Sequence, residues 1–435
     1  MYGNIEKLAD ELQEELIECR RDLHKHAETG WLEMRTSSLV ARKLTELGYE
    51  VLTGKDVCME GERMGVPPEE VLKQHYEWAK AHGADSHFLE TAKGGFTGVI
   101  GILRCGAGPV IALRFDMDAL GISEDISRSH RPHREGFASV TDGAMHACGH
   151  DGHTAIGLGT AALLAKLKEH LSGTVKLIFQ PAEEGVRGSK SIVEHGHLDD
   201  VDYVMGTHLT ASDDEGCYIC PGMSGTFATT KLDAEFLGIS AHAGVCPQNG
   251  KNAMLAAASA ILNLQAIPRH GGGDTRINVG AVHAGSGRNV ICDRARLELE
   301  VRGETTETNS YMEEYAVQIL EGAAVMHGCE LDIKKAGSAA SIECSPEFTQ
   351  YISETCSRKL KMVVRKPDDM GGSEDFAYMT KRVIDNGGQA CFTGIQIPCA
   401  APFHNQKFDF DEKALTLGVK FYAGVIFDLL GKSEG

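Results

Sequence analysis

The sequence predicts an α/β protein whose main domain is interrupted by a second domain of α+β type. The chain has 435 residues, which is more than a single hydrophobic core usually holds. Apolar strand and helix patterns alternate over the first half of the chain, and the order of elements changes near Ser224. The α/β style resumes after about residue 338, so we expect the second domain to be an insertion into the first.

The first domain begins with a helical segment that runs to about Gly48. Three strands are then expected, at 110–115, 174–180 and 201–207. An apolar helix over 154–170 separates the first two, and this alternation is typical of a parallel sheet. The polar stretch 56–93 interrupts the order as an insertion with a helical middle, and its role is open. We assign residues 1–223 and 338–435 to this domain.

The second domain, residues 224–337, has a different order of elements. Four strands are expected in it, at 229–236, 276–283, 294–301 and 330–334. Helices over 252–266 and 307–327 follow the first and the third of these strands. The order β-α-β-β-α-β is that of the ferredoxin-like unit. Because such a sheet leaves strand edges able to pair, we expect this domain to dimerise.

Composition limits the partners and the compartment. The 43 basic and 62 acidic residues give a net charge of −19, which would repel the phosphates of nucleic acids and of anionic membranes. No apolar run approaches the ~20 residues of a membrane-spanning helix. The first 16 residues form an acidic amphipathic pattern and not a signal peptide. Thirteen cysteines without framework spacing fit reduced thiols in the cytoplasm, and the isolated Cys217 and Cys220 pair is expected to be structural.

A dense cluster of candidate metal ligands lies directly before the apolar helix. It consists of His146, Cys148, His150, Asp151 and His153. A thiolate and an imidazole two residues apart, where a loop enters a helix, can turn toward one cation, and such ligands suit zinc or manganese-like ions. A single Cys-x-His pair also arises by chance in a chain with 19 His and 13 Cys, so the interpretation needs further ligands.

Further candidates follow other expected strands. Glu183 and Glu184 come just after a strand, where one carboxylate could ligate a metal and the other take a proton from water. His208 follows the next strand, and His404 follows a later apolar stretch. Taken singly, the glutamates also fit a solvated acidic turn, and each histidine an ordinary loop. Because ligands gather beyond the carboxyl ends of strands in open α/β sheets, their common placement predicts one metal site.

Six segments together resemble the motifs of metal-dependent amidohydrolases, a family that includes auxin-conjugate hydrolases, hippurate hydrolases and, more distantly, carboxypeptidase G and aminoacylase. They are RFDMDAL (114–120), MHACGHDGHTA (145–155), FQPAEEG (179–185), SAHAG (240–244), GSGRNVI (285–291) and GGSEDFAYM (371–379). The resemblance implies a mixed-sheet metallopeptidase catalytic domain with an inserted dimerisation or lid domain. HKHAETGWLEMRT, the 56–93 insertion and the ending HNQKFDFDE are similar to the branch of p-aminobenzoyl-glutamate hydrolases.

The resemblance also implies a two-metal site. Its ligands would be Cys148, His150, Glu184, His208 and His404. Cys148 would bridge the two divalent ions where other branches have an aspartate, and a thiolate bridge is softer and oxidisable. We expect manganese as the first choice of metal and zinc as the alternative.

Catalytic roles follow from the same resemblance. Glu183 would be the general base that takes a proton from water and returns it to the leaving nitrogen. His242 is similar to the family's transition-state histidine, usually presented to the neighbouring subunit, with a capping turn residue as the alternative. Asp116 would orient an imidazole, and Arg114 stands where more distant relatives have a ligating histidine. Asp118 belongs to the site or is a plain strand-end carboxylate.

Substrate-binding groups are expected in the inserted domain and in the last motif. Arg302 and Asn289 are similar to the residues that hold the substrate's free carboxylate, and Arg288 could share the task. A guanidinium fork suits a carboxylate, although surface residues without a role remain the alternative. The resemblance also assigns Gly372 to substrate binding.

The expected function is hydrolysis of p-aminobenzoyl-glutamate, a folate breakdown product, to p-aminobenzoate and glutamate. A broader N-acyl-amino-acid or dipeptide amidohydrolase is the alternative, because the catalytic motifs do not distinguish acyl groups. A non-catalytic subunit of a hetero-oligomer is a third hypothesis, and the presence of Glu183 and all five ligands argues against it. The expected partners are a small N-acyl amino acid and either a second copy of the chain or a homologous subunit.

Overall fold

The computed structural model describes residues 2–432, which form two compact units. The large unit comprises the chain up to Ser224, Glu343–Asp369 and the chain from Asp375 onward. The inserted unit comprises Gly225–Ile342 and Met370–Glu374. The chain leaves the inserted unit after Ile342 and not at residue 337, because its last strand continues to Ala339 and pairs there with the first.

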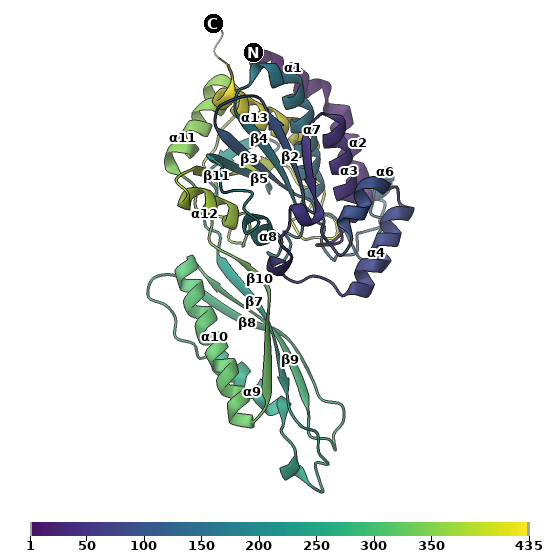
Figure 1. The fold of residues 1–435 in the computed structure, drawn as a ribbon, viewed down its shortest axis with the longest axis vertical. Helices are drawn as coiled ribbons and strands as arrows, with labels where there is room; N and C mark the ends of the chain where they lie inside the picture. The colour runs from purple at the N-terminus through teal and green to yellow at the C-terminus, as the bar shows by residue number, and fades with distance from the viewer. Residues whose placement is uncertain (1, 433–435) are drawn as a thin grey trace. The chain divides into compact units, whose positions relative to one another are not determined.

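A seven-stranded mixed sheet forms the centre of the large unit (Figure 1). Its strands, in the order in which they pair, are β1 (Glu50–Thr53), β2 (Val99–Arg104), β4 (Thr174–Gln180), β3 (Val110–Asp116), β5 (Tyr203–Ala211), β11 (Gln389–Ile397) and β6 (Tyr218–Pro221). The four strands β4, β3, β5 and β11 are parallel. The pairs β1–β2, β2–β4 and β11–β6 are antiparallel, which confirms the mixed sheet.

Helices cover this sheet on both faces. The helices of the large unit, on and beside the sheet, are α1 (Tyr2–Glu11), α2 (Gln13–Lys25), α3 (Met34–Glu46), α4 (Glu69–Ala81), α5 (Ser86–Leu89), α6 (Arg131–Glu135), α7 (His150–Leu167), α8 (Ser189–Val193), α11 (Pro346–Glu354), α12 (Ala377–Asp385) and α13 (Lys413–Leu430). Neighbouring side chains of a strand point to opposite faces. In β3, Phe115 packs under Gly157 of α7, whereas Arg114 lies against Phe376 at the start of α12. The helices α7 and α12 therefore lie on opposite faces.

Two expected helices have different bounds in the structure. The single helical segment expected to reach Gly48 is three helices, α1 to α3, because the turn HAETGWLE separates α2 from α3. Helix α7 starts at His150 and not at residue 154, so the candidate ligand His150 is its first residue. No helix within residues 2–432 combines the length and apolarity that crossing a membrane requires.

The inserted unit is a four-stranded antiparallel sheet with two helices on one face (Figure 1). Its elements are β7 (Ala228–Leu237), α9 (Ala253–Leu264), β8 (Thr275–Ala284), β9 (Arg294–Gly303), α10 (Thr306–His327) and β10 (Glu330–Ala339). The strand order β10-β7-β9-β8 is the ferredoxin-like arrangement. Thr305 caps the start of α10, and Gly328 ends it in the left-handed conformation. The apolar face of the sheet packs on both helices through Phe236, Leu297 and Met312.

Candidate metal centre

The predicted ligands lie at the carboxyl-end side of the parallel strands. Cys148 is in the loop before α7, and Glu184 follows β4. His208 lies within β5, which continues to Ala211, and His404 lies between β11 and α13. Parallel strands that share one direction place such residues at one edge of the sheet.

The structure brings all five predicted ligands together in the large unit. They form three overlapping groups whose donor atoms lie within 4.8 Å of one another: Cys148–His150–His208, Cys148–Glu184–His404 and His150–Glu183–Glu184. Sγ of Cys148 is 3.5 Å from Nε2 of His208. Nε2 of His404 is 3.5 Å from Oε1 of Glu184. The thiol and the carboxylate thus connect histidines from three different segments of the chain.

Hydrogen bonds made by Nδ1 favour, in two of the histidines, the ring tautomer that suits metal binding through Nε2. Nδ1 of His150 lies 2.8 Å from the carbonyl oxygen of Asp118, and Nδ1 of His208 contacts the carbonyl oxygen of Leu209. A carbonyl can only accept, so each Nδ1 donates its hydrogen, and in the neutral ring this leaves the lone pair on Nε2, toward the donor cluster. Burial also lowers the pKa of His208 to about 3, so this ring is neutral at pH 7.

Unsatisfied atoms and excess negative charge mark the same place. Nε2 of His150 and Oε1 of Glu184 are buried and have no hydrogen-bond partner among residues 2–432. Burial, with the nearby Glu184 carboxylate, raises the pKa of the Cys148 thiol well above its usual value. Burial, opposed by His150 and reinforced by Asp118, raises the pKa of Glu184 to about 7. A divalent cation among these donors would satisfy the orphaned atoms and compensate the charge.

Buried carboxylates hold the loop that carries Glu183 and Glu184. Asp118 accepts hydrogen bonds from the backbone N–H groups of both glutamates, each at 2.9 Å. Glu33 accepts a third from the N–H of Ala182 at 2.8 Å. Ala182 itself has a φ of 52°, a conformation that costs a non-glycine residue about 1 kcal/mol or more. Sequence reasoning left Asp118 open and missed Glu33, although Asp118 lies inside the motif RFDMDAL.

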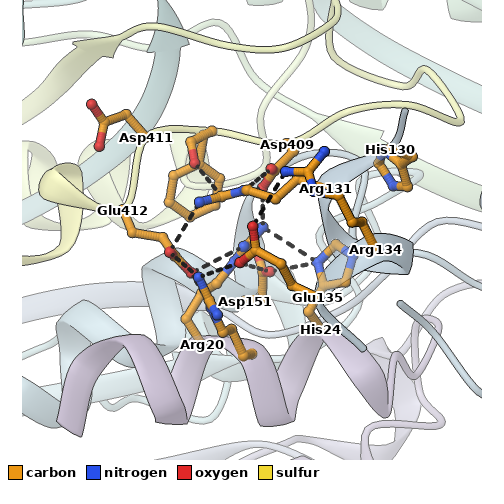
Figure 2. Close-up of polar contacts among 12 residues, drawn as sticks. Arg20, His24, His130, Arg131, Arg134, Glu135, Asp151, Asp409, Asp411 and Glu412 are labelled. Atoms are coloured by element: carbon orange, nitrogen blue, oxygen red, sulfur yellow. Dashed lines mark hydrogen bonds and ion pairs between the residues drawn. The ribbon is translucent and has the colours of Figure 1, made fainter. Parts of the chain in front are cut away.

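The segment that carries His404 is tied to α7 by a buried network of charged side chains (Figure 2). Arg20 donates to Asp151 at 2.8 Å and to Asp409 at 3.1 Å. Arg131 forms a bidentate pair with the same Asp409. Asp151 directly follows the ligand candidate His150, so the network couples the positions of His150 and His404. The sequence did not indicate these arginines, since their partners lie between 131 and 389 positions away.

Asp116 orients the imidazole of His153, which belongs to the candidate cluster but not to the five ligands that the family resemblance implies. Its Oδ1 contacts Nδ1 of His153, and its Oδ2 pairs with Arg114, which is fully buried. The backbone N–H of Leu209 donates to Nε2 of His153 at 3.0 Å. Both ring nitrogens of His153 are thus occupied, and this leaves no lone pair for a metal, although His153 lies close to Asp116 and His150.

The candidate residues of the inserted unit fall into two separate places. The His242 loop pairs with the loop of Asn289. The backbone N–H of Ala243 donates to the Asn289 carbonyl at 3.0 Å, and His242 forms an isolated antiparallel β-bridge with Val290. Arg288 is exposed in the second of these loops. These loops adjoin the Arg294 end of β9, and Arg302 lies at its other end, roughly 27 Å away at ~3.4 Å per residue.

Arg302 already has an acidic partner. Its Nε and Nη2 donate to Glu300 at 2.9 and 3.2 Å, so its charge is not left unpaired in the absence of substrate. The carbonyl of Gly372 accepts from Phe227 N–H at 2.8 Å, which attaches the Met370–Glu374 segment to the start of the inserted unit. The substrate-binding roles of both residues stay predictions.

The mixed α/β sheet, the ferredoxin-like insertion and the donor cluster together define a metal-dependent hydrolase of amide bonds. The model of peptidase family M20/M25/M40 matches residues 112–428, and the chain belongs to this family. The family inferred from the sequence motifs is thereby confirmed.

Several relatives match nearly end to end. The chain is 43% identical to one of the subunits of p-aminobenzoyl-glutamate hydrolase from Escherichia coli (strain K12), over 97% of both chains. It is 44% identical to indole-3-acetyl-aspartic acid hydrolase of Enterobacter agglomerans over 95% of both. Its fold is similar to the crystal structure of an aminobenzoyl-glutamate utilization protein from Klebsiella pneumoniae, with a TM-score of 0.85, 37% identity and 98% of each chain covered. A dinuclear metal-binding M20 peptidase of Bacillus subtilis is similar at a TM-score of 0.66 and 28% identity, over 97% of this chain and 99% of that one.

Proposed function

We propose that this protein hydrolyses the amide bond of p-aminobenzoyl-glutamate, releasing p-aminobenzoate and glutamate, with two divalent metal ions. The observation that carries the proposal is that five donor side chains lie close together. Two buried atoms of this cluster have no hydrogen-bond partner in the described chain. The end-to-end similarity to proteins named for aminobenzoyl-glutamate supports this substrate.

The donor set fits such ions. Cys148, His150, Glu184, His208 and His404 would hold them, with Cys148 placed between the histidine pair and the Glu184–His404 pair. Mixed thiolate, imidazole and carboxylate donors suit both manganese and zinc, and we propose manganese first. When bound, the ions would acidify a water molecule and polarise the amide carbonyl.

Glu183 is the proposed general base. Its side chain is buried, and Oε2 lies 3.9 Å from Nε2 of His150, beside the donor cluster. Asp118 accepts a hydrogen bond from its backbone N–H, which restrains the loop that carries this carboxylate. Glu183 would take the proton from the attacking water and deliver it to the leaving nitrogen of glutamate. Glu184 is the less suitable base, because its Oε1 faces His404 inside the cluster.

His242 would stabilise the charge that develops on the carbonyl oxygen, acting from a neighbouring protomer. Its loop follows β7, so it lies one strand length, roughly 30 Å, from the point where the chain enters the inserted unit. On this unit, β8 pairs only with β9 among the described strands, and the neighbouring α9 exposes Met254, Leu255 and Leu262. We propose that a second copy or a homologous subunit pairs along this edge.

We place the enzyme in the cytoplasm, where its thirteen cysteines, all free thiols, would stay reduced. Arg302, Asn289, Arg288 and Gly372 are proposed to contact the substrate. Because Arg302 is paired with Glu300, it would bind a carboxylate only by exchanging partners, so its contribution should be smaller than that of an unpaired arginine.

Hydrolysis of indole-3-acetyl-aspartate is the second candidate function. The relative of that name is 44% identical over 95% of both chains, so overall similarity does not separate the two acyl groups. Both substrates join an aromatic acyl group to an acidic amino acid. A panel of these two compounds and neutral N-acyl amino acids would test the assignment.

The decisive experiment combines metal removal with Glu183→Gln. Chelated wild type should lose activity and regain it with Mn²⁺, and elemental analysis should give up to two ions per chain. Glu183→Gln should keep the metal content and lose at least about 10²-fold in kcat, the scale of general acid–base catalysis. Full activity in metal-free wild type, or in Glu183→Gln, would overturn the proposed mechanism.

A further inference from the structure

Arg187 lies in the catalytic loop and has no acidic partner. Its Nε donates to the carbonyl of Glu184 at 2.8 Å, and its Nη1 donates to the carbonyl of Gly65 at 3.1 Å. Within residues 2–432 its guanidinium makes no ion pair, in contrast to Arg114 and Arg131. The side chain is half-buried, and its Nη2 is neither hydrogen-bonded nor fully buried. The positive charge is therefore fixed in place and still available.

The surroundings of Arg187 are shaped to hold the guanidinium. A Cβ on Gly30 would lie only 2.2 Å from Nη2, so this position admits only glycine while the arginine stays where it is. Gly65, which supplies the second carbonyl, belongs to the 56–93 insertion and has a φ of 58°. The insertion, whose role the sequence left open, thus helps to orient this arginine.

The distance from the metal ligands is short. Arg187 is three residues from Glu184, which limits the separation of their Cα atoms to about 11 Å. The guanidinium contacts the Glu184 backbone directly. One small substrate could therefore place one functional group at the donor cluster and a second one at Arg187.

A substrate with two carboxylates needs a cation here. The site contains Asp116, Asp118, Glu183 and Glu184, and the chain as a whole has a net charge of −19. An additional carboxylate would be repelled unless a positive group compensates it. A guanidinium has five N–H donors, of which two are used here, so a fork remains for a carboxylate.

We propose that Arg187 is a specificity-determining residue that binds the side-chain carboxylate of an N-acylated acidic amino acid. This inference rests on the proposed hydrolysis of such a conjugate and adds the residue that selects glutamate or aspartate over neutral amino acids. The alternative is a purely structural role, in which Arg187 only links Gly65 to the loop of Glu184 by hydrogen bonds.

The test compares matched substrates on matched variants. The substrates are p-aminobenzoyl-glutamate and p-aminobenzoyl-glutamine, which differ only in the side-chain charge, together with indole-3-acetyl-aspartate and its asparagine analogue. The variants are wild type, Arg187→Met, Arg187→Lys and Lys190→Met. Lys190 is the control, since it also joins this segment to the insertion, by an ion pair with Glu62 at 2.8 Å.

Wild type should prefer each acid over its amide by at least about tenfold in kcat/KM, the scale of one charge-assisted hydrogen bond. Arg187→Met should remove that preference by raising KM for the acids at least about tenfold, with the amides changed less than about twofold. Arg187→Lys should restore part of the preference, because it keeps the charge but not the fork. Lys190→Met should keep the wild-type preference.

The outcomes separate this inference from the proposed function. Equal losses on acid and amide in Arg187→Met, or no acid preference in wild type, would overturn the specificity role and leave the hydrolase assignment intact. A wild type that cleaves only indole-3-acetyl-aspartate, with a preference that Arg187→Met abolishes, would support the role of Arg187 and overturn the aminobenzoyl assignment. Cleavage of neutral conjugates alone would overturn both.

Discussion

Replacing Asp118 by Asn tests whether the buried carboxylate positions Glu184, the proposed metal ligand. Asp118 is 1% exposed, and its two oxygens accept the N–H groups of Glu183 and Glu184 at 2.9 Å each. An Asn side chain keeps one acceptor and turns an NH₂ donor toward the other N–H. One charge-assisted hydrogen bond is therefore lost and one buried donor is left unpaired, a cost of about 1.5–3 kcal/mol.

The loop is expected to relieve this cost by shifting, which would move Glu184 away from Cys148 and His404. Isothermal titration of the chelator-treated protein with Mn²⁺ should then show affinity reduced by about 10–100-fold, the scale for carboxylates that support metal ligands. The kcat of the Mn²⁺-saturated enzyme should also fall, because Glu183 shares the same anchor.

Asp428→Asn provides the control. Asp428 also accepts hydrogen bonds from polar side chains, those of Tyr351 and Thr355, but it is half-buried and lies in the last turn of α13. That turn packs beside Leu171 and Ser172, at the amino ends of the parallel strands and away from the donor cluster. Asp428→Asn should reduce stability without changing Mn²⁺ affinity. If Asp118→Asn bound Mn²⁺ and turned over like this control, the positioning role would be refuted.

Two further predictions concern the subunit interface and pH. Mixing inactive Glu183→Gln with inactive His242→Ala subunits should restore part of the activity, because one hybrid site contains both intact groups. If activity did not return although subunit exchange was demonstrated, His242 would act on the site of its own chain. Burial and the charge of Asp118 raise the pKa of Glu33 from 4.5 to about 8, so between these values the folded chain retains a proton that the unfolded chain has lost. The contribution of Glu33 to stability should therefore fall as pH rises from 4.5 to 8. Unfolding measured at each pH should show the stability of wild type falling relative to that of Glu33→Gln over this range; parallel curves would contradict this assignment.

The local sequence was sufficient to predict the parts of the centre that depend on neighbours in the chain. Cys148 and His150 are two residues apart at the start of α7, and Glu183 and Glu184 follow the strand β4 directly. The strand-end rule then predicted that His208 and His404 would join them, although His208 proved to lie within β5. The motif RFDMDAL predicted that Asp116 would orient an imidazole, and only the structure identifies this ring as that of His153.

Groups that act through long-range contacts could not be predicted. Glu33 holds Ala182 from 149 positions away, and Arg20 reaches Asp409 across 389 positions. The unpaired state of Arg187 and the paired state of Arg302 are likewise invisible in sequence, because both depend on which oxygens surround the guanidinium after folding.

The sequence by itself determined the α/β class, the approximate position of the insertion and the set of candidate donor residues, since hydrophobic periodicity and short motifs are local properties of the chain. Tertiary structure alone decided which carboxyl groups anchor the loop of Glu183 and Glu184, which histidine nitrogens face the donor cluster, and which arginine makes no ion pair among the described residues. These features depend on burial and on hydrogen bonds between distant segments, and such contacts are formed only when the strands bring those segments to one edge of the sheet.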